Sequence, residues 1–298
     1  MIARKSALLI VVFFLGPAEM IRSHARVRQI TVAVLDFGNS VLGKVATDQL
    51  VKKLKSVGAV SIIDRDAGMS AVRGAGYAGS LNLSLKEARD LGEGIGCDFY
   101  FIGDAQTLRR SVSSKPIYFE SYASIFLVSS RTGKLVMWER PSFEGTDPTA
   151  VEQKLLDALA RSDLAERYWA AIQKASSEEK QQRELAIATA LPIIEEVPED
   201  EKAAEAVGLR MPRPYRRLRP VYPETAARAD AEAVVDVFVD LDAAGEVVRI
   251  DVTRWAGFGL DEATVDTVRQ LHFFPAMRNG RPIPIRILLR YNFRKPVR

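Results

Sequence analysis

The last quarter of the chain carries three strand patterns and one helix pattern in a fixed order, and this order constrains the fold more than any other feature. Apolar and acidic residues alternate over 233–241, which is the period of a half-buried strand. A return strand is expected at 246–254, and apolar residues recur at helical spacing over 260–271. After a turn at Asn279-Gly280, residues 283–293 alternate again. The pattern predicts a small module of strand, strand, helix and strand, whose first two strands form an antiparallel hairpin.

Prolines predict where the third strand lies in the sheet. Pro282 and Pro284 open this strand, and proline is confined to edge strands or strand starts because it has no N–H to donate. An edge strand has spare backbone N–H and C=O groups that a foreign peptide can pair with. Arg286 and Arg290 share a face with Leu288, and these arginines either keep the edge soluble or orient an acidic peptide.

Residues 220–293 resemble the C-terminal domain of TonB-type energy transducers. The resemblance rests on linked motifs in a specific order: Tyr222-Pro223 before the first strand, an acidic residue and a glycine in the hairpin, Phe274-Pro275-Ala276, Asn279-Gly280-Arg281-Pro282, and a closing Phe293. It implies a non-enzymatic periplasmic module that binds a short extended segment of an outer-membrane receptor. Tyr222-Pro223 either fixes the entry of the chain into the first strand or lies near the bound segment, as it does in the resembled family. The expected partner-binding residues are Tyr222, Pro223, Ile285, Arg286, Leu288, Arg290 and Tyr291.

Residues 29–146 alternate between strand and helix patterns, which predicts a mixed α/β domain with a sheet backed by helices. Ser84 and Glu87 form a capping-box pattern at the start of one helix. The segments VAVLDFGNS, SIIDRD and GCDFYFIGDAQ resemble the α/β domain shared by CsgG, LpoB and the N-terminal part of TolB. Proteins of that group assemble structures of the bacterial envelope. Relatives of the CsgG and LpoB type are usually lipoproteins, whereas this sequence has no lipobox cysteine.

Two segments connect the predicted domains. Residues 147–191 read as helical, and the second half of this segment is polar enough to face water. Residues 192–219 turn from acidic to proline- and arginine-rich, which predicts a charged extended linker. The alternative for its arginines is contact with anionic lipid, peptidoglycan or an acidic partner. Together with a C-terminal domain at 220–298, the chain is predicted to be an α+β protein of two domains.

The first 25 residues have the pattern of a secretory signal peptide. Arg4 and Lys5 precede an apolar run at 7–15, which is about half of the roughly 20 residues that a membrane-spanning helix needs. The pattern favours cleavage and a periplasmic protein over an uncleaved anchor in the inner membrane that faces the periplasm. A force-transducing TonB would need that anchor to engage an ExbB/ExbD-type motor.

Catalytic and metal-binding patterns are weak in this chain. Gly74, Gly76 and Gly79 fit the spacing of a dinucleotide fingerprint, but they do not directly follow a predicted strand. With only His24 and His272, the sequence offers no histidine-rich metal site, and no cofactor is predicted. Four carboxylates at strand ends favour turn and cap roles over acid–base work or cation binding: Asp36, Asp64, Asp66 and Asp104. Cys97, the single cysteine, is expected to be buried and inert, and His272 and Trp255 to be packing residues.

The sequence therefore predicts a non-enzymatic periplasmic protein with a TonB-like domain, acting in transport or organisation of the Gram-negative envelope. Its partner would be an outer-membrane receptor or another envelope protein, bound by strand addition to the third strand. The mildly basic net charge of +4 is not gathered along a helix, so nucleic acid is not an expected partner. The alternative is an envelope assembly factor in which the C-terminal module makes a homodimer or a larger oligomer.

Overall fold

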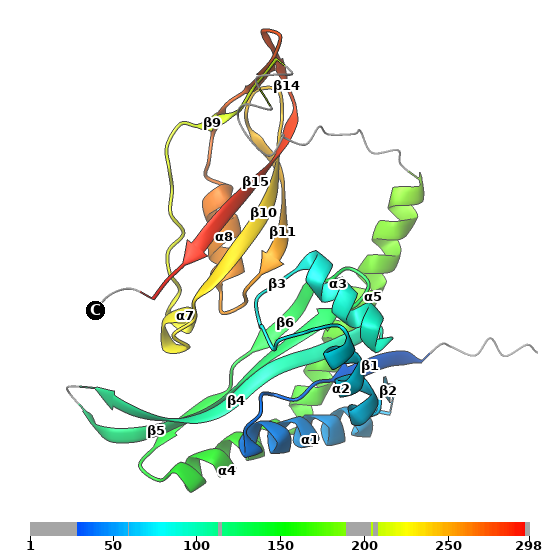
Figure 1. The fold of residues 1–298 in the computed structure, drawn as a ribbon, viewed down its shortest axis with the longest axis vertical. Coiled ribbons are helices and arrows are strands. Elements are labelled where there is room, and N and C mark those ends of the chain that lie inside the picture. The colour runs from blue at the N-terminus through cyan, green and yellow to red at the C-terminus, as the bar shows by residue number, and fades with distance from the viewer. Residues whose placement is uncertain (1–28, 59, 113–114, 189–203, 205–207, 296–298) are drawn as a thin grey trace, which may run out of the picture.

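The computed structural model describes residues 29–58, 60–112, 115–188, 204 and 208–295. The predicted signal peptide and the first part of the predicted linker lie outside these residues. Figure 1 shows two lobes, with the C-terminal domain standing on the sheet of the N-terminal domain. Among the described residues, no helix is both long enough and apolar enough to cross a bilayer. The chain has the predicted α+β organisation.

The N-terminal domain is built on one mixed sheet in the order β2-β1-β4-β5-β6, with β7 also paired to β5. β1 runs parallel to β2 and β4, and β4, β5 and β6 are antiparallel neighbours. The strands are β1 (Ile30–Val34), β2 (Val60–Ile62), β4 (Phe99–Val112), β5 (Lys115–Ser129), β6 (Leu135–Glu139) and β7 (Ser142–Gly145).

Helices cover both faces of this sheet. The helices are α1 (Val41–Ser56), α2 (Arg65–Gly74), α3 (Leu85–Ile95), α4 (Pro148–Leu159) and α5 (Ser162–Ala188). α1, α4 and α5 bury one face, where Val32 and Phe101 of the sheet pack in one core with Tyr168 of α5. α2 and α3 cover the other face, which holds Ala33 and Tyr100. Successive strand residues thus enter opposite cores, as the pleat of a strand requires.

Local sequence explains where the helices begin. Ser40 caps α1 and Asp64 caps α2, each by accepting hydrogen bonds from backbone N–H groups of the first turn. Ser84 and Glu87 form the predicted capping box of α3. The expected helical segment at 147–191 is part of the N-terminal domain, because apolar residues of α4 and α5 pack into the same core as α1.

The C-terminal domain has the predicted order. It contains β10 (Ala233–Leu241), β11 (Val247–Trp255), α8 (Leu260–Val268) and β15 (Ile285–Phe293), preceded by the short helix α7 (Glu224–Arg228). β10 lies in the centre and pairs antiparallel with both β11 and β15. α8 covers the face that carries Val235, Val237 and Val239.

Part of the predicted linker belongs to this domain. β8 (Leu209–Arg210) pairs with β13 (Ala276–Arg278), and β9 (Arg213–Pro214) pairs with β12 (Phe273–Phe274). β14 (Arg281–Ile283) completes the small sheet with β13. Leu209 is buried in the domain core, so this part of the chain does not form an extended solvated spacer.

Candidate functional site

The predicted acceptor strand, β15, is an outer strand of its sheet. It pairs with β10 from Ile285 to Phe293, and no strand among the described residues pairs with its other edge. Ile285 is fully buried and Tyr291 is half-buried, so both side chains belong to the α8 side of the sheet. Leu288 lies on the opposite face and is 50% exposed. The expected binding residues of β15 thus divide between two faces of one outer strand.

Arg286 and Arg290 are held by aspartates of the neighbouring strand. Arg286 donates to both carboxylate oxygens of Asp240 at 2.6 and 2.8 Å, and Arg290 donates to both oxygens of Asp236 at 2.7 and 2.9 Å. Each arginine lies directly opposite its aspartate in the ladder. Such two-pronged bonds fix the guanidinium geometry. Sequence alternation predicted these aspartates on a solvated face, whereas the structure buries them beneath the arginines.

Tyr222 and Pro223 lie at the entrance to β10. The Tyr222 hydroxyl donates to the carbonyl oxygen of Ala231 at 2.6 Å, and its ring lies 6.4 Å from that of Phe293. Pro223 is the residue that precedes α7. The structure thus brings the first and last aromatic residues of the TonB-like motif together, and these contacts fix the path of the chain into the sheet.

The N-terminal domain covers one end of the opposite edge of the C-terminal sheet. β3 (Leu83–Ser84) pairs antiparallel with the end of β11, where Leu83 is opposite Trp255. The Asn82 side chain extends this contact, since its Nδ2 donates to the carbonyl oxygens of Val234 and Trp255 at 2.8 and 2.7 Å. Its Oδ1 accepts from the Val234 N–H at 3.1 Å. One short segment therefore joins the sheet of the second domain to the first.

Trp255 inserts into the core of the N-terminal domain. Only 2% of its surface is exposed, and it packs in the cluster that contains Leu83, Tyr100 and Phe126. Its indole Nε1 donates to the carbonyl oxygen of Gly133 at 2.9 Å. The expected role as a packing residue is confirmed, but its partners come from the other domain. Such a contact between distant segments has no signal in local periodicity.

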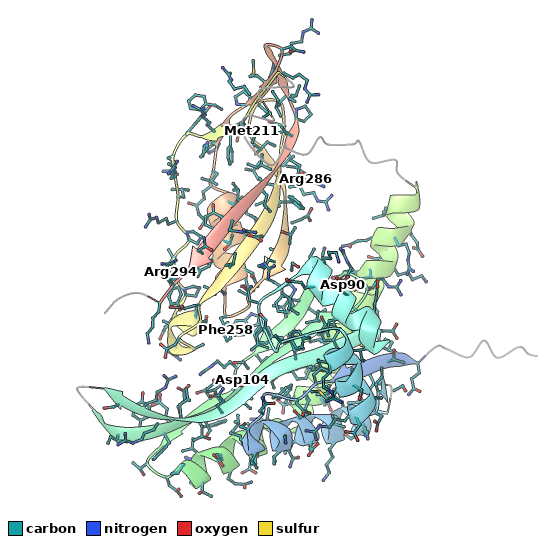
Figure 2. All side chains as sticks on the ribbon, viewed as in Figure 1. Asp90, Asp104, Met211, Phe258, Arg286 and Arg294 are labelled. Carbon is teal, nitrogen blue, oxygen red and sulfur yellow. The ribbon has the colours of Figure 1, made fainter. Side chains whose placement is uncertain are left out.

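The loop after Trp255 completes the contact. Gly257 has a φ of +70°, and a Cβ at this position would lie 2.5 Å from Cε1 of Phe126. Only glycine adopts this positive φ without strain and also leaves room for the Phe126 ring. Phe258 follows, edge-on to Phe126, and Figure 2 shows it between the two domains. The turn thus approaches the first domain too closely for any other residue.

Asp261 holds this loop from the first turn of α8. Its oxygens accept from the backbone N–H groups of Ala256 and Gly257 at 2.9 and 2.8 Å. Burial raises the pKa of its carboxyl to about 6, against an ordinary value of 3.8, although the two hydrogen bonds act in the opposite direction. The proton therefore binds more readily to the folded protein than to the unfolded chain.

This pKa predicts a pH dependence of folding. The stabilisation from the protonated carboxyl is fully present below pH 3.8 and is lost as the pH rises through about 6. Relative to Asp261→Asn, the wild-type free energy of unfolding is expected to increase by about 2 kcal/mol between pH 7 and pH 4, because the stabilisation is not yet complete at pH 4. Urea unfolding of both proteins across this range measures the difference. A difference that does not change with pH would contradict the shifted pKa.

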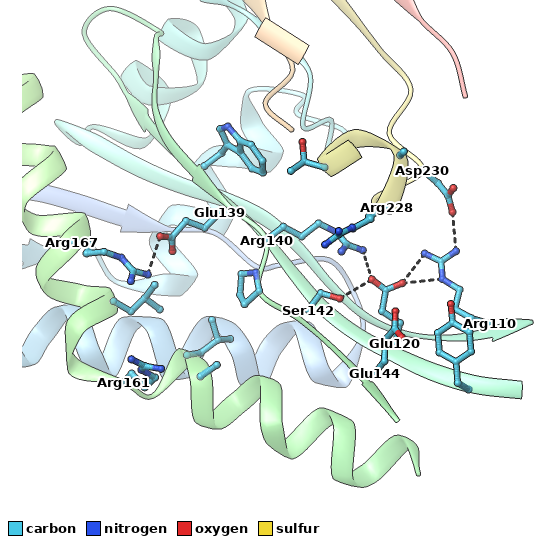
Figure 3. A pocket seen from close by; sticks show the side chains of 18 of the residues that line it. Arg110, Glu120, Glu139, Arg140, Ser142, Glu144, Arg161, Arg167, Arg228 and Asp230 are labelled. Atoms are coloured by element: carbon cyan, nitrogen blue, oxygen red, sulfur yellow. Dashed lines mark hydrogen bonds and ion pairs between the residues drawn. The ribbon is translucent and has the colours of Figure 1, made fainter. Parts of the chain in front are cut away.

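The domains also meet through a second, polar contact. Its residues line a cavity of about 1010 Å³. Arg110 on β4 donates to Glu120 on β5 at 2.9 Å and to Asp230 of the C-terminal domain at 2.8 Å (Figure 3). Glu120 also accepts from Arg140 and Ser142, both at 2.8 Å. Burial would raise the pKa of Glu120, but these hydrogen bonds and cations hold it below its ordinary value. The carboxylates and cations balance one another, so the cavity has no clear preference for an anion or a cation.

The other chemical candidates have structural roles. Gly74 ends α2, so the glycines at 74–79 follow a helix rather than a strand. Asp36 accepts from Arg65, and Asp104 accepts from Tyr122 and Gln106. Within the described ranges, no cluster of three or more His, Cys, Asp or Glu side chains is placed to hold a metal ion.

His272 and Cys97 are the remaining side chains for which the sequence predicted a role, and His272 is exposed whereas Cys97 is partly buried. His272 was expected to pack at the helix end, but it is exposed and its Nδ1 lies 2.8 Å from an oxygen of Glu246. Burial raises the pKa of the Cys97 thiol to about 11. The thiol was expected to be buried and inert; it is only partly buried, and its raised pKa lowers the fraction of the reactive thiolate near neutral pH.

Comparison with known proteins gives a family match for the C-terminal domain. Residues 219–294 match the family model for the C-terminal domain of Gram-negative bacterial TonB proteins. The solution structure of the Pseudomonas aeruginosa TonB C-terminal domain is 19% identical, with 36% of this chain and 98% of that chain covered and a TM-score of 0.27. The LpoB C-terminal domain from Salmonella enterica is 14% identical, with 39% and 82% covered and a TM-score of 0.29. No curated protein matches the chain.

The family match includes the sequence motifs that characterise this domain. The match covers β10, β11, α8 and β15 in full, and it begins just before Tyr222-Pro223. Residues 219–294 therefore form a TonB C-terminal domain, docked on a separate α/β domain of the same chain.

Proposed function

We propose that this chain is a non-enzymatic envelope protein of the periplasm, in which the TonB-like domain binds an extended segment of an outer-membrane or other envelope protein. The family match supports the class of partner. The observation that carries the proposal is the different state of the two sheet edges. The last two residues of β11 are already paired with β3, whereas β15 has no strand partner beyond β10 along its whole length among the described residues.

The binding mode would be strand addition. A row of outward N–H and C=O groups along β15 supplies affinity, and the side chains on the two faces supply specificity. On one face the segment would pass Leu288, which lies opposite Phe238 in the ladder. On the other it would pass Tyr291, which packs against the domain core.

The arginines have a narrower role in this proposal than in the sequence-based hypothesis. Arg286 and Arg290 are already neutralised by Asp240 and Asp236, so they do not supply two net positive charges to an acidic segment. They flank the apolar Leu288 and limit the hydrophobic area at the edge, which is a common protection against edge-to-edge aggregation. Tyr222 and Pro223 would support the end of the sheet, and Ile285 would contribute only its backbone.

Cross-linking from the two edges tests the proposal. Leu288→Cys places a thiol on β15, and the matched control Val248→Cys places one on β11 at a similar exposure, 61% against 50%. Both variants also carry Cys97→Ser, which removes the native, partly buried thiol, so each variant has a single thiol. The full-length variants are labelled in the Gram-negative envelope with a maleimide that carries a photoreactive group, and the adducts are identified by mass spectrometry.

The expected result is an adduct between Leu288→Cys and an outer-membrane or other envelope protein, with little or none from Val248→Cys. Equal yields from both positions would contradict binding at β15. An adduct of Leu288→Cys with a second copy of the chain alone would instead assign the edge to oligomerisation, which is the function that the alternative hypothesis gives to this module.

A further inference from the structure

The C-terminal domain carries a second surface that the strand edge does not use. Two segments, 208–219 and 272–284, contain seven arginines and no aspartate or glutamate. β8, β9, β12, β13 and β14 bring these segments side by side. Figure 1 shows β9 and β14 toward the end of the molecule that is farthest from α4. Pairing thus converts two stretches of sequence into one arginine-rich end of the domain.

Most of these arginines face solvent. Arg210, Arg216, Arg217 and Arg281 are exposed, and within the described part of the chain none of the four forms an ion pair. This differs from the arginines of β15, each of which has an aspartate beneath it. The arginine-rich end therefore has a positive charge that the described residues do not balance.

Two exposed aromatic rings lie within the same region. Tyr215 and Phe274 are 59% and 58% exposed, and their ring centroids are 4.4 Å apart. The backbone holds them, since the Tyr215 N–H donates to the carbonyl oxygen of His272 at 2.8 Å, and Phe274 is paired with Arg213 in the ladder. Large apolar side chains are rarely left so exposed in pairs without a partner.

We propose that this arginine-rich end binds the surface of a bilayer that contains anionic phospholipid. Arginine pairs with lipid phosphates through two N–H groups, and aromatic rings settle at the boundary between headgroups and acyl chains. An acidic protein segment would use the arginines but leaves the exposed ring pair unexplained. The position of the charge at one end of an elongated molecule also suits contact with a flat surface.

Vesicle binding tests the proposal with the full chain. The probes are vesicles of phosphatidylcholine alone and vesicles with roughly one part in four of phosphatidylglycerol. Arg210→Gln/Arg281→Gln removes two charges from the arginine-rich end. Lys52→Gln/Lys55→Gln removes two exposed charges from α1 and is the matched control. Residues 1–28 are the same in all proteins, and binding is measured as the excess on anionic vesicles over phosphatidylcholine vesicles, which removes any contribution from the apolar leader.

Each basic residue near an anionic surface changes the partition coefficient by about fivefold. Arg210→Gln/Arg281→Gln is therefore expected to weaken co-sedimentation with anionic vesicles by about twentyfold to thirtyfold, and the lysine control by less than about twofold. Phe274→Ser is expected to weaken it as well. Binding should disappear at about 0.5 M salt, where the screening length falls to about 4 Å. Circular dichroism checks that each variant is folded.

Two results would overturn the proposal. The first is wild-type protein that binds both kinds of vesicle equally, and the second is an arginine variant that binds like the lysine control. Binding to polyglutamate that is lost in the arginine variant, without any preference for anionic vesicles, would assign this end of the domain to an acidic protein and would also overturn the lipid proposal.

Discussion

Replacing Trp255 with alanine is expected to lower the free energy of unfolding by about 4 kcal/mol, within the range for large aromatic residues in a core. The indole is 2% exposed and packs, beside Phe258, in the core that contains Tyr100 and Phe126. Its loss leaves a cavity at the boundary of the two domains and removes a hydrogen bond to Gly133. The two domains should then unfold at different urea concentrations.

Fluorescence and circular dichroism together measure this separation. After Trp255→Ala, the remaining tryptophans are Trp138 on β6 and Trp169 on α5, so fluorescence reports the N-terminal domain while circular dichroism reports both. The two transitions are expected to coincide in the wild type and to differ in the variant. Trp255→Phe keeps most of the buried ring but loses the N–H donor, and should cost about half as much. Coincident transitions with a loss below about 1 kcal/mol would show that the domains are not coupled through this residue.

Asp240→Ala is expected to destabilise the C-terminal domain by about 3 kcal/mol. The carboxylate is only 3% exposed, and it accepts from two nitrogens of Arg286, whose side chain is 25% exposed. Removal of the carboxylate leaves a partly buried guanidinium without these two bonds, and such a group is costly because water does not fully reach it. Thermal and urea unfolding measure the loss.

Asp236→Ala is the matched comparison on the same strand. Its main partner Arg290 is 59% exposed and can turn into water after the substitution, so the expected loss is about 1 kcal/mol. A double-mutant cycle of Asp240→Ala with Arg286→Ala should give a coupling energy well above that of Asp236 with Arg290. Equal costs for the two aspartates would show that burial of the arginine does not decide the energy.

The sequence predicts the elements of both domains but not how they join. Period-2 alternation over nine residues predicts β10 and β15, because one face of each strand is buried. The same reasoning places Asp236 and Asp240 in solvent, since alternation reports polarity and not the arginine that covers a polar group. A cross-strand ion pair depends on register, which one strand alone does not fix.

Sequence patterns cannot predict the pairings between the shortest strands. β3, β8, β9 and β12 have two residues each, which is too few for any periodicity. Residues 208–219 therefore read as a proline- and arginine-rich spacer, although they pair with the segment after α8. The outer position of β15 agrees with the prediction, but the prolines used for it lie outside that strand, since Pro282 belongs to β14 and Pro284 precedes β15. The pairing of Leu83 with the end of β11 could not be predicted.

The closure of β11 has a practical consequence for anyone who excises the TonB-like domain. A fragment that begins near residue 208 would lose Asn82, Leu83 and the apolar core around Phe126 in which Trp255 is buried. It would present a bare backbone edge and a solvent-exposed indole at the same end, a combination that favours strand-swapped dimers in vitro. Dimers or receptor contacts that such a fragment makes through the exposed end of β11 would report the cut surface, whereas contacts through β15 use an edge that the intact chain also presents.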